Sequence, residues 1–129
     1  MRALVVQAPH IERILDGAKI WEIRGSRTNV REQIGLIRGG SGTIIGVCEL
    51  IDCTGPLTAE QFRKNARKLG MTPSKAELLY GYYKKTYAWV LANPSYLRIP
   101  VPYNHPSGAI IWVRLESATQ RAVKRALKR

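Results

Sequence analysis

The densest group of polar side chains in this sequence lies between residues 17 and 31. Within it, Lys19, Glu22 and Arg24 place one carboxylate between two cations. A lysine beside a glutamate in a cleft can act as an acid, a base or a nucleophile, because burial and neighbouring charges change both pKa values. The same residues could equally form a solvated salt-bridge strand with no chemical role. We therefore take Lys19 and Glu22 as candidate catalytic residues and keep that alternative open.

The segment that carries these residues has the alternation of a strand and runs into a polar loop. A strand over residues 19–24 would place Glu22 and Arg24 on one face and Trp21 on the other, because side chains alternate. Lys19 would share the face of Trp21 unless the strand begins just after it. Guanidinium and hydroxyl groups in the loop could hold a phosphate. The candidate substrate-binding residues are therefore Arg24, Ser26, Arg27 and Arg31.

The charge of the chain indicates a polyanionic partner. The 129 residues include 21 Lys and Arg against 9 Asp and Glu, which gives a net charge of +12. Residues 57–90 and 114–129 each carry a net charge of +5, so two segments hold most of the excess. Such asymmetry favours nucleic acid, because neutralised phosphates release counterions. Solubility alone and an anionic membrane surface are the alternatives.

Three groups of cations are candidate nucleic-acid-binding residues. A helix predicted from Thr58 to about Lys68 would align four of them in one stripe. Two more follow a tyrosine-rich stretch, where aromatic rings could stack on bases or pack against the fold. The third group belongs to a basic helix predicted at about 117–129, which could lie along RNA or dock on the fold. The residues are Arg63, Lys64, Arg67, Lys68, Lys84, Lys85, Arg121, Lys124, Arg125 and Lys128.

Histidine and cysteine provide weaker signals. A paired-histidine ribonuclease would need His10 and His105, but these lie 95 positions apart and His105 is typical of a turn beside Pro106. Cys48 and Cys53 fit no metal-binding pattern and are most simply buried strand residues. We therefore expect no metal and no organic cofactor, and a reduced, cytoplasmic setting. No apolar run is long enough to span a membrane.

The elements that must position these residues are short. Apolar alternation predicts strands over residues 2–7, 19–24, 33–38, 43–53, 86–91 and 109–115. Helices are expected over residues 10–16, 58–68, 72–80 and 117–129, and residues 92–108, with four prolines, are expected to form a loop. Because strands and helices do not alternate as βαβ units, we predict a mainly β, α+β fold. It would be a small, mostly antiparallel barrel of about six strands with peripheral helices, in a single domain spanning residues 1–129.

The run Gly17-x-Lys19-x-x-Glu22-x-Arg24 resembles the signature of the ASCH domain family, a branch of the PUA-like superfamily. Its surroundings are also similar, so that the likeness spans roughly residues 4–115. The matching downstream segments are Tyr87–Leu91, His105-Pro106-x-Gly108 and Trp112-Val113. The resemblance implies a PUA-like β-barrel with a cleft lined by Lys19, Glu22 and Arg24.

The resemblance also implies a role that involves RNA, since family members are associated with RNA binding, ribonuclease activity and RNA modification. We expect the chain to bind single-stranded RNA in a basic cleft, with metal-independent ribonuclease activity as a further possibility. The alternative is an amidohydrolase acting on a modified nucleoside such as N4-acetylcytidine. The branch with that activity uses a lysine and a threonine three residues later, and Glu22 stands where the threonine would be. Whether the chain is catalytic, and its oligomeric state, are left open.

Overall fold

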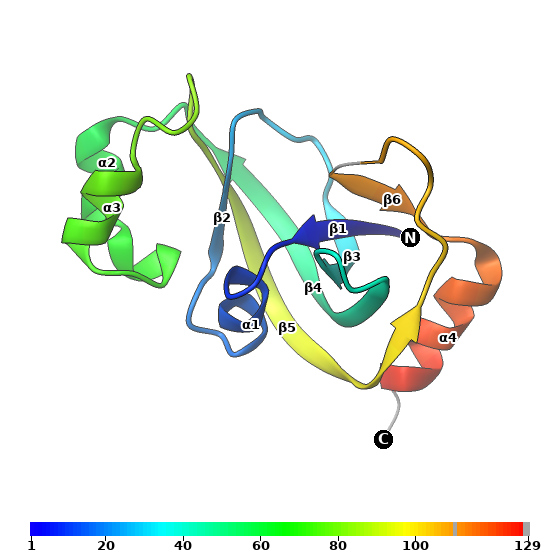
Figure 1. The fold of residues 1–129 in the computed structure, drawn as a ribbon. Helices are drawn as coiled ribbons and strands as arrows, with labels where there is room; N and C mark the ends of the chain where they lie inside the picture. Colours follow the sequence, from blue (N-terminus) through cyan, green and yellow to red (C-terminus); the bar gives the residue numbers. More distant parts are fainter. Residues whose placement is uncertain (110, 128–129) are drawn as a thin grey trace.

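A computed structural model describes residues 1–109 and 111–127, and its centre is a six-stranded sheet with the order β2-β5-β4-β3-β1-β6. Only the β1–β3 pair is parallel among the strand pairs of the described residues. The sheet curls into a half-barrel with helices around it (Figure 1). The strands are β1 (Arg2–Val6), β2 (Trp21–Arg24), β3 (Glu32–Arg38), β4 (Thr43–Thr54), β5 (Tyr87–Pro102) and β6 (Trp112–Arg114). This confirms the predicted mainly β fold with about six strands.

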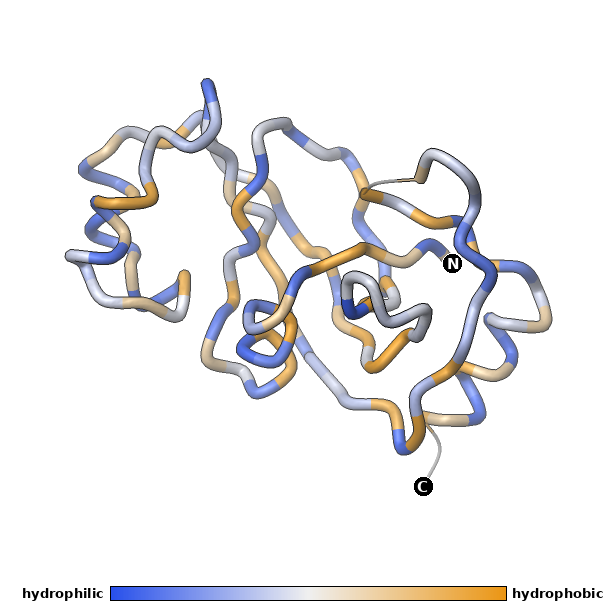
Figure 2. The backbone as a smooth tube through the Cα atoms, viewed as in Figure 1, coloured by the Kyte–Doolittle hydropathy of each residue, from blue (hydrophilic) through white to orange (hydrophobic). Residues whose placement is uncertain are grey.

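Two apolar clusters cover the two faces of the sheet, because alternate residues of β1 point to opposite sides. Leu4 and Val6 belong to one cluster, beneath helix α1 (His10–Leu15). Ala3 belongs to the other, into which helix α4 (Ser117–Leu127) inserts Val123. Figure 2 shows hydrophobic and hydrophilic residues alternating along α4, as expected for a helix that docks on one side. Of the two alternatives left open for the basic C-terminal helix, docking on the fold is observed over its described residues.

A helical segment between β4 and β5 forms a third, smaller cluster against the end of β2. It consists of α2 (Ala59–Lys64), a 3-10 helix (Ala66–Leu69) and α3 (Pro73–Leu79). Thr58 and Gln61 form the predicted capping box at the start of α2. Phe62 and Leu69 are buried in this cluster together with Trp21. The segment therefore forms a wall beside β2, at the left of Figure 1.

The region predicted as a loop over residues 92–108 is partly wrong, because β5 continues to Pro102. Two of its prolines lie where the ladder is interrupted, and a third is the last residue of the strand. Pro94 follows Asn93, whose φ is 51°, where the register against β4 shifts between Val47 and Glu49. Pro100 lies in the next interruption and Pro102 ends the strand. Proline is tolerated in strands at such bulges and ends, where no amide donor is needed.

Three further boundaries differ from the sequence prediction. The helix expected to reach Lys68 ends at Lys64, because Asn65 turns the chain and its side-chain amide donates to the Gln61 carbonyl oxygen at 2.7 Å. The last strand is shorter than residues 109–115, and β2 begins at Trp21 rather than at Lys19. The last of these changes decides where the Lys19 side chain lies.

Candidate functional site

A cleft of about 580 Å³ opens between the end of β1, α1, β2 and the segment after α3. We call it the cleft throughout. Its polar and aromatic lining comes from separate parts of the chain: Gln7, His10, Lys19, Glu22, Arg24, Phe62, Tyr82, Tyr83 and Thr86. Three of the candidate residues named from the sequence, Lys19, Glu22 and Arg24, therefore meet in one cavity.

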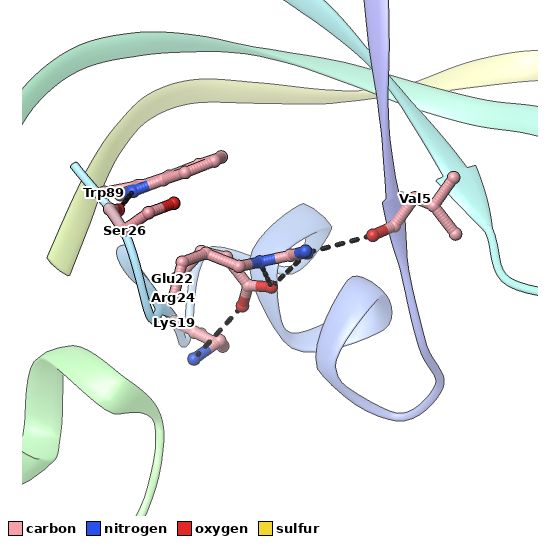
Figure 3. Close-up of polar contacts among 6 residues, drawn as sticks. All are labelled: Val5, Lys19, Glu22, Arg24, Ser26 and Trp89. Atoms are coloured by element: carbon pink, nitrogen blue, oxygen red, sulfur yellow. Dashed lines mark hydrogen bonds and ion pairs between the residues drawn. The ribbon is translucent and has the colours of Figure 1, made fainter. Parts of the chain in front are cut away.

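The centre of the cleft is a buried carboxylate between two cations (Figure 3). Glu22 Oε1 lies 3.7 Å from Lys19 Nζ, and Glu22 Oε2 lies 2.7 Å from Arg24 Nη2. Lys19 is only 3% exposed and Glu22 only 8%. The three residues therefore form a desolvated ion cluster. The solvated salt-bridge strand left open by the sequence does not describe them.

Local backbone geometry brings Lys19 to Glu22. Helix α1 ends before Gly17, whose φ of 83° is accessible mainly to glycine, and the chain reverses there. The Lys19 amide donates to the Arg13 carbonyl oxygen at 3.0 Å, which holds Lys19 outside the strand. Glu22 and Arg24 are two residues apart in β2, so their side chains lie on the same face of the strand.

Burial lowers the pKa of Lys19 below the usual range of a lysine. The attraction and hydrogen bonding of Glu22 act in the opposite direction, and the positive charges of Arg13 and Arg24 add smaller decreases. A lysine in such surroundings gives up its proton more readily than an exposed lysine does. At a given pH a larger fraction of Lys19 is therefore neutral than of a surface lysine, and only the neutral amine can act as a base or attack an electrophile.

Arg24 holds this cluster in place. Its Nε and Nη2 both donate to Glu22 Oε2, and Nη2 also donates to the Val5 carbonyl oxygen at 2.9 Å. Its guanidinium carbon lies 5.6 Å from the centre of the Trp89 ring. Arg24 thus connects β2 to β1 and fixes the orientation of Glu22, so most of its donors point to the protein.

His10 was weighed from the sequence only as half of a histidine pair with His105, and the structure places it in the cleft. It begins α1, is half-buried, and its Nδ1 atom is buried without a hydrogen-bond partner among the described residues. Burial lowers the pKa of His10, and the positive charge of Lys19 lowers it further. At neutral pH the ring is therefore neutral and able to accept a proton.

Tyr82 and Tyr83 form an aromatic wall on the far side of the cleft. Tyr82 is 82% exposed, and the two rings meet edge to face at a centroid distance of 5.0 Å. Tyr83 rests on Gly25, where an added Cβ would lie 2.7 Å from the ring. Tyr80 instead packs inward, donating its hydroxyl to the Leu57 carbonyl oxygen at 2.8 Å. Lys84 and Lys85 are exposed immediately after this wall.

The other candidate substrate-binding residues do not line the cleft. Arg27 donates to the Gly55 carbonyl oxygen at 2.9 Å and lies over the Tyr87 ring. Arg31 donates to the carbonyl oxygens of Thr28 and Val30. Ser26 accepts a hydrogen bond from the Trp89 indole through its carbonyl oxygen at 2.9 Å. The structure brings Arg24 alone of this group to the cavity, and substrate binding by the others stays a prediction.

The candidate nucleic-acid-binding cations lie in separate places. Arg63, Lys64 and Arg67 line a second groove next to the cleft, whereas the Lys68 ammonium lies 5.0 Å from the centre of the Trp21 ring. The single stripe expected from a continuous helix is therefore divided. Arg121, Lys124 and Arg125 are exposed on α4, at the opposite side of Figure 1 from α2 and α3. Lys128 lies outside the described residues.

Metal and thiol chemistry find little support in this region. Within the described residues, no group of three or more His, Cys, Asp and Glu side chains is placed to hold a metal ion. Burial raises the pKa of the Cys48 thiol to about 12, which makes it a poor nucleophile. Cys53 is half-buried rather than buried. No helix in the described part of the chain is long and apolar enough to cross a bilayer.

Comparison with known proteins gives a family and a fold. The model of the ASCH domain family matches residues 4–101. The crystal structure of ASCH from Zymomonas mobilis is similar with a TM-score of 0.72 at 13% identity, covering 98% of this chain and 94% of that chain. A tyrosine-to-phenylalanine mutant of the same protein is similar with a TM-score of 0.71, at 13% identity and 96% coverage of both chains. No curated protein matches the sequence.

Proposed function

The chain belongs to the ASCH domain family, and from this premise we propose that its cleft binds single-stranded RNA. Family membership supports an RNA-binding, PUA-like domain in general. The finer proposal rests on one observation, the convergence of the buried Lys19–Glu22–Arg24 cluster and an exposed tyrosine wall on one cavity. A nucleobase needs both an apolar surface for its ring and polar groups for its edge.

The cleft supplies these two requirements from opposite sides. Tyr82 offers an exposed ring on which a base can stack. Lys19 Nζ and the neutral His10 ring face the same cavity and can hydrogen-bond the base edge. Lys84 and Lys85, beside the tyrosines, are available to phosphates. Because bases in a duplex are paired and stacked, single strands are the better ligand for such a cleft.

Titration of a short single-stranded RNA and its duplex, over a series of salt concentrations, tests the proposal. We expect tighter binding of the single strand and affinity that falls as salt rises. Tyr82→Ala and Lys19→Met should each weaken binding of the single strand. Arg114→Gln is the matched control, because it removes one exposed positive charge on β6, away from the cleft. Affinity that is independent of salt, or equal losses in all three variants, would contradict binding in the cleft.

Metal-independent RNA cleavage is a second candidate, favoured by His10 and Lys19 sharing the cleft. In such a reaction a base removes the 2′-OH proton, O2′ attacks phosphorus, and the bond to O5′ breaks as an acid protonates that oxygen. His10 and Lys19 are the types of group that these transfers need. Incubation with RNA in a metal chelator, followed by separation of the products, tests it. Cyclic phosphate products that disappear in His10→Gln and Lys19→Met are expected, and intact RNA in the wild type would exclude cleavage.

A further inference from the structure

A second concave surface, the basic groove, lies next to the cleft and has a different chemical character. It has a volume of about 590 Å³ and is lined by five cations, Arg13, Arg63, Lys64, Arg67 and Lys75. Its described lining includes no aromatic residue and no carboxylate. The groove therefore lacks what a base would stack on and has what a phosphate would bind.

Only part of this positive charge is neutralised by the protein. Arg63 Nε lies 3.6 Å from Glu77 Oε1, and Lys64 Nζ lies 3.0 Å from Glu60 Oε1. Among the described residues, Arg13, Arg67 and Lys75 form no ion pair. Like charges at one surface repel each other, and an anion that binds them all would remove this repulsion.

The groove and the cleft share a thin wall. Met71 lines both, while the consecutive residues Ala18 and Lys19 line the groove and the cleft respectively. The wall is tightly packed, since a Cβ added to Gly70 would lie 3.2 Å from Lys19 Cβ. The Ile20 amide also donates to the Lys68 carbonyl oxygen at 2.9 Å. The two cavities are therefore adjacent, and the Met71 side chain is common to both.

We propose that the basic groove binds the phosphodiester backbone of the nucleotides next to the one whose base occupies the cleft. The substrate class is then an RNA oligonucleotide and not a free nucleoside. This inference rests on the function proposed for the cleft. It divides recognition into a base subsite with a tyrosine wall and a phosphate subsite with two free guanidinium groups, which suit phosphate oxygens in a two-pronged contact.

A length series tests the groove separately from the cleft. We would measure the affinity of uridine monophosphate and of oligouridylates of increasing length for the wild type and for the variants Arg67→Gln, Arg13→Gln, Arg114→Gln and Lys19→Met. Affinity of the wild type should rise with length. Each groove variant should make the negative slope of log affinity against log salt shallower by about 0.7 for oligonucleotides, which is about a fivefold loss of affinity at 0.1 M salt. The monophosphate should bind Arg67→Gln and the wild type equally.

The possible results separate the two proposals. If Arg67→Gln and Arg13→Gln keep the full gain with length, or lose no more than Arg114→Gln, the groove does not bind the backbone. If Lys19→Met still weakens the monophosphate in that case, the function of the cleft stands and the groove proposal alone is wrong. Failure of every RNA to bind the wild type would overturn both. Because Arg67 is exposed, its substitution should leave the thermal transition unchanged, which circular dichroism would verify.

Discussion

Replacing Glu22 by glutamine would leave two buried cations without their shared anion. Glu22 faces Lys19 with one oxygen and accepts two hydrogen bonds from Arg24 with the other. The side chains of Lys19 and Arg24 are 3% and 15% exposed, so water cannot replace the lost carboxylate fully. Removing one partner of a buried ion pair costs about 3–5 kcal/mol, because the remaining charge stays desolvated. We expect Glu22→Gln to lower the free energy of unfolding by about that amount.

Glu60→Gln is a matched control for this substitution. Glu60 Oε1 lies 3.0 Å from Lys64 Nζ, which is closer than Glu22 Oε1 lies to Lys19 Nζ. The side chains of Glu60 and Lys64 are, however, each 65% exposed. Exposed pairs contribute only about 0.2–1 kcal/mol. If the distance between the charges decided the effect, Glu60→Gln would lower the free energy of unfolding more than Glu22→Gln does. If burial decides it, as the structure indicates, Glu22→Gln costs several times more.

The effect of Glu22→Gln should also depend on pH, through Lys19. The pKa of Lys19 in the folded chain lies below its unfolded value, and loss of Glu22 lowers it further because Glu22 raises it. The folded variant is therefore least stable where Lys19 must stay charged, at pH values below its folded pKa. Stability returns as the pH rises through that value, since the neutral amine needs no partner. Arg24 remains charged, so part of the loss persists.

Urea denaturation of the wild type, Glu22→Gln and Glu60→Gln at about pH 7 and about pH 9.5 measures both effects. The difference between Glu22→Gln and the wild type should be smaller at the higher pH. If the variant is too unstable to study, the double variant Glu22→Gln with Lys19→Met should regain stability, because only one unpaired cation then remains. The interpretation as a desolvated cluster would be refuted if Glu22→Gln and Glu60→Gln lowered the free energy of unfolding equally and the double variant regained none of it.

Three further results are expected. Because the pKa of His10 is lowered in the folded chain, the wild type should lose more stability than His10→Gln as the pH falls through its unfolded value, and urea denaturation at about pH 7 and about pH 5 checks this. Little N4-acetylcytidine should be hydrolysed, since Glu22 stands in place of a threonine hydroxyl; chromatography that shows rapid turnover, abolished by Lys19→Ala, would reverse this. The double variant Lys124→Gln with Arg125→Gln should bind every nucleic acid more weakly by a similar factor, and its affinity should depend less on salt concentration. A loss confined to one RNA sequence would indicate base recognition by α4.

The ion cluster could be predicted from the sequence because its geometry is local. Lys19, Glu22 and Arg24 lie within six residues, and strand alternation alone places two of them together. The position of Lys19 depended on whether β2 began before or after it. That boundary is set by two hydrogen bonds, from the Lys19 amide to the Arg13 carbonyl oxygen and from the Ile20 amide to the Lys68 carbonyl oxygen, which spacing does not reveal.

The opposite wall of the cleft could not be predicted in the same way. Tyr82 and Tyr83 lie some sixty residues after the cluster in sequence, and composition allowed either stacking on bases or packing on the fold. Tertiary packing determines which tyrosine is exposed. The Tyr80 ring packs against Phe62 at a centroid distance of 5.5 Å, while Tyr82 remains exposed. The length of β5 was missed for a related reason, because prolines are poor strand residues unless tertiary contacts create a bulge around them.

The architecture separates the groups that can do chemistry from those that can select a ligand. The ion cluster lies on or beside β2, a strand held by β5 and tied to β1 through Arg24. The tyrosine wall and most cations of the basic groove belong instead to the helical segment between β4 and β5. That segment contacts the sheet through a small cluster around Phe62 and Leu69. Under the proposed function, substitutions at its exposed residues Tyr82 and Arg67 would alter which RNA is held, whereas changes at Lys68 or Gly70, which contact Ile20 and Lys19, would also move the buried cluster.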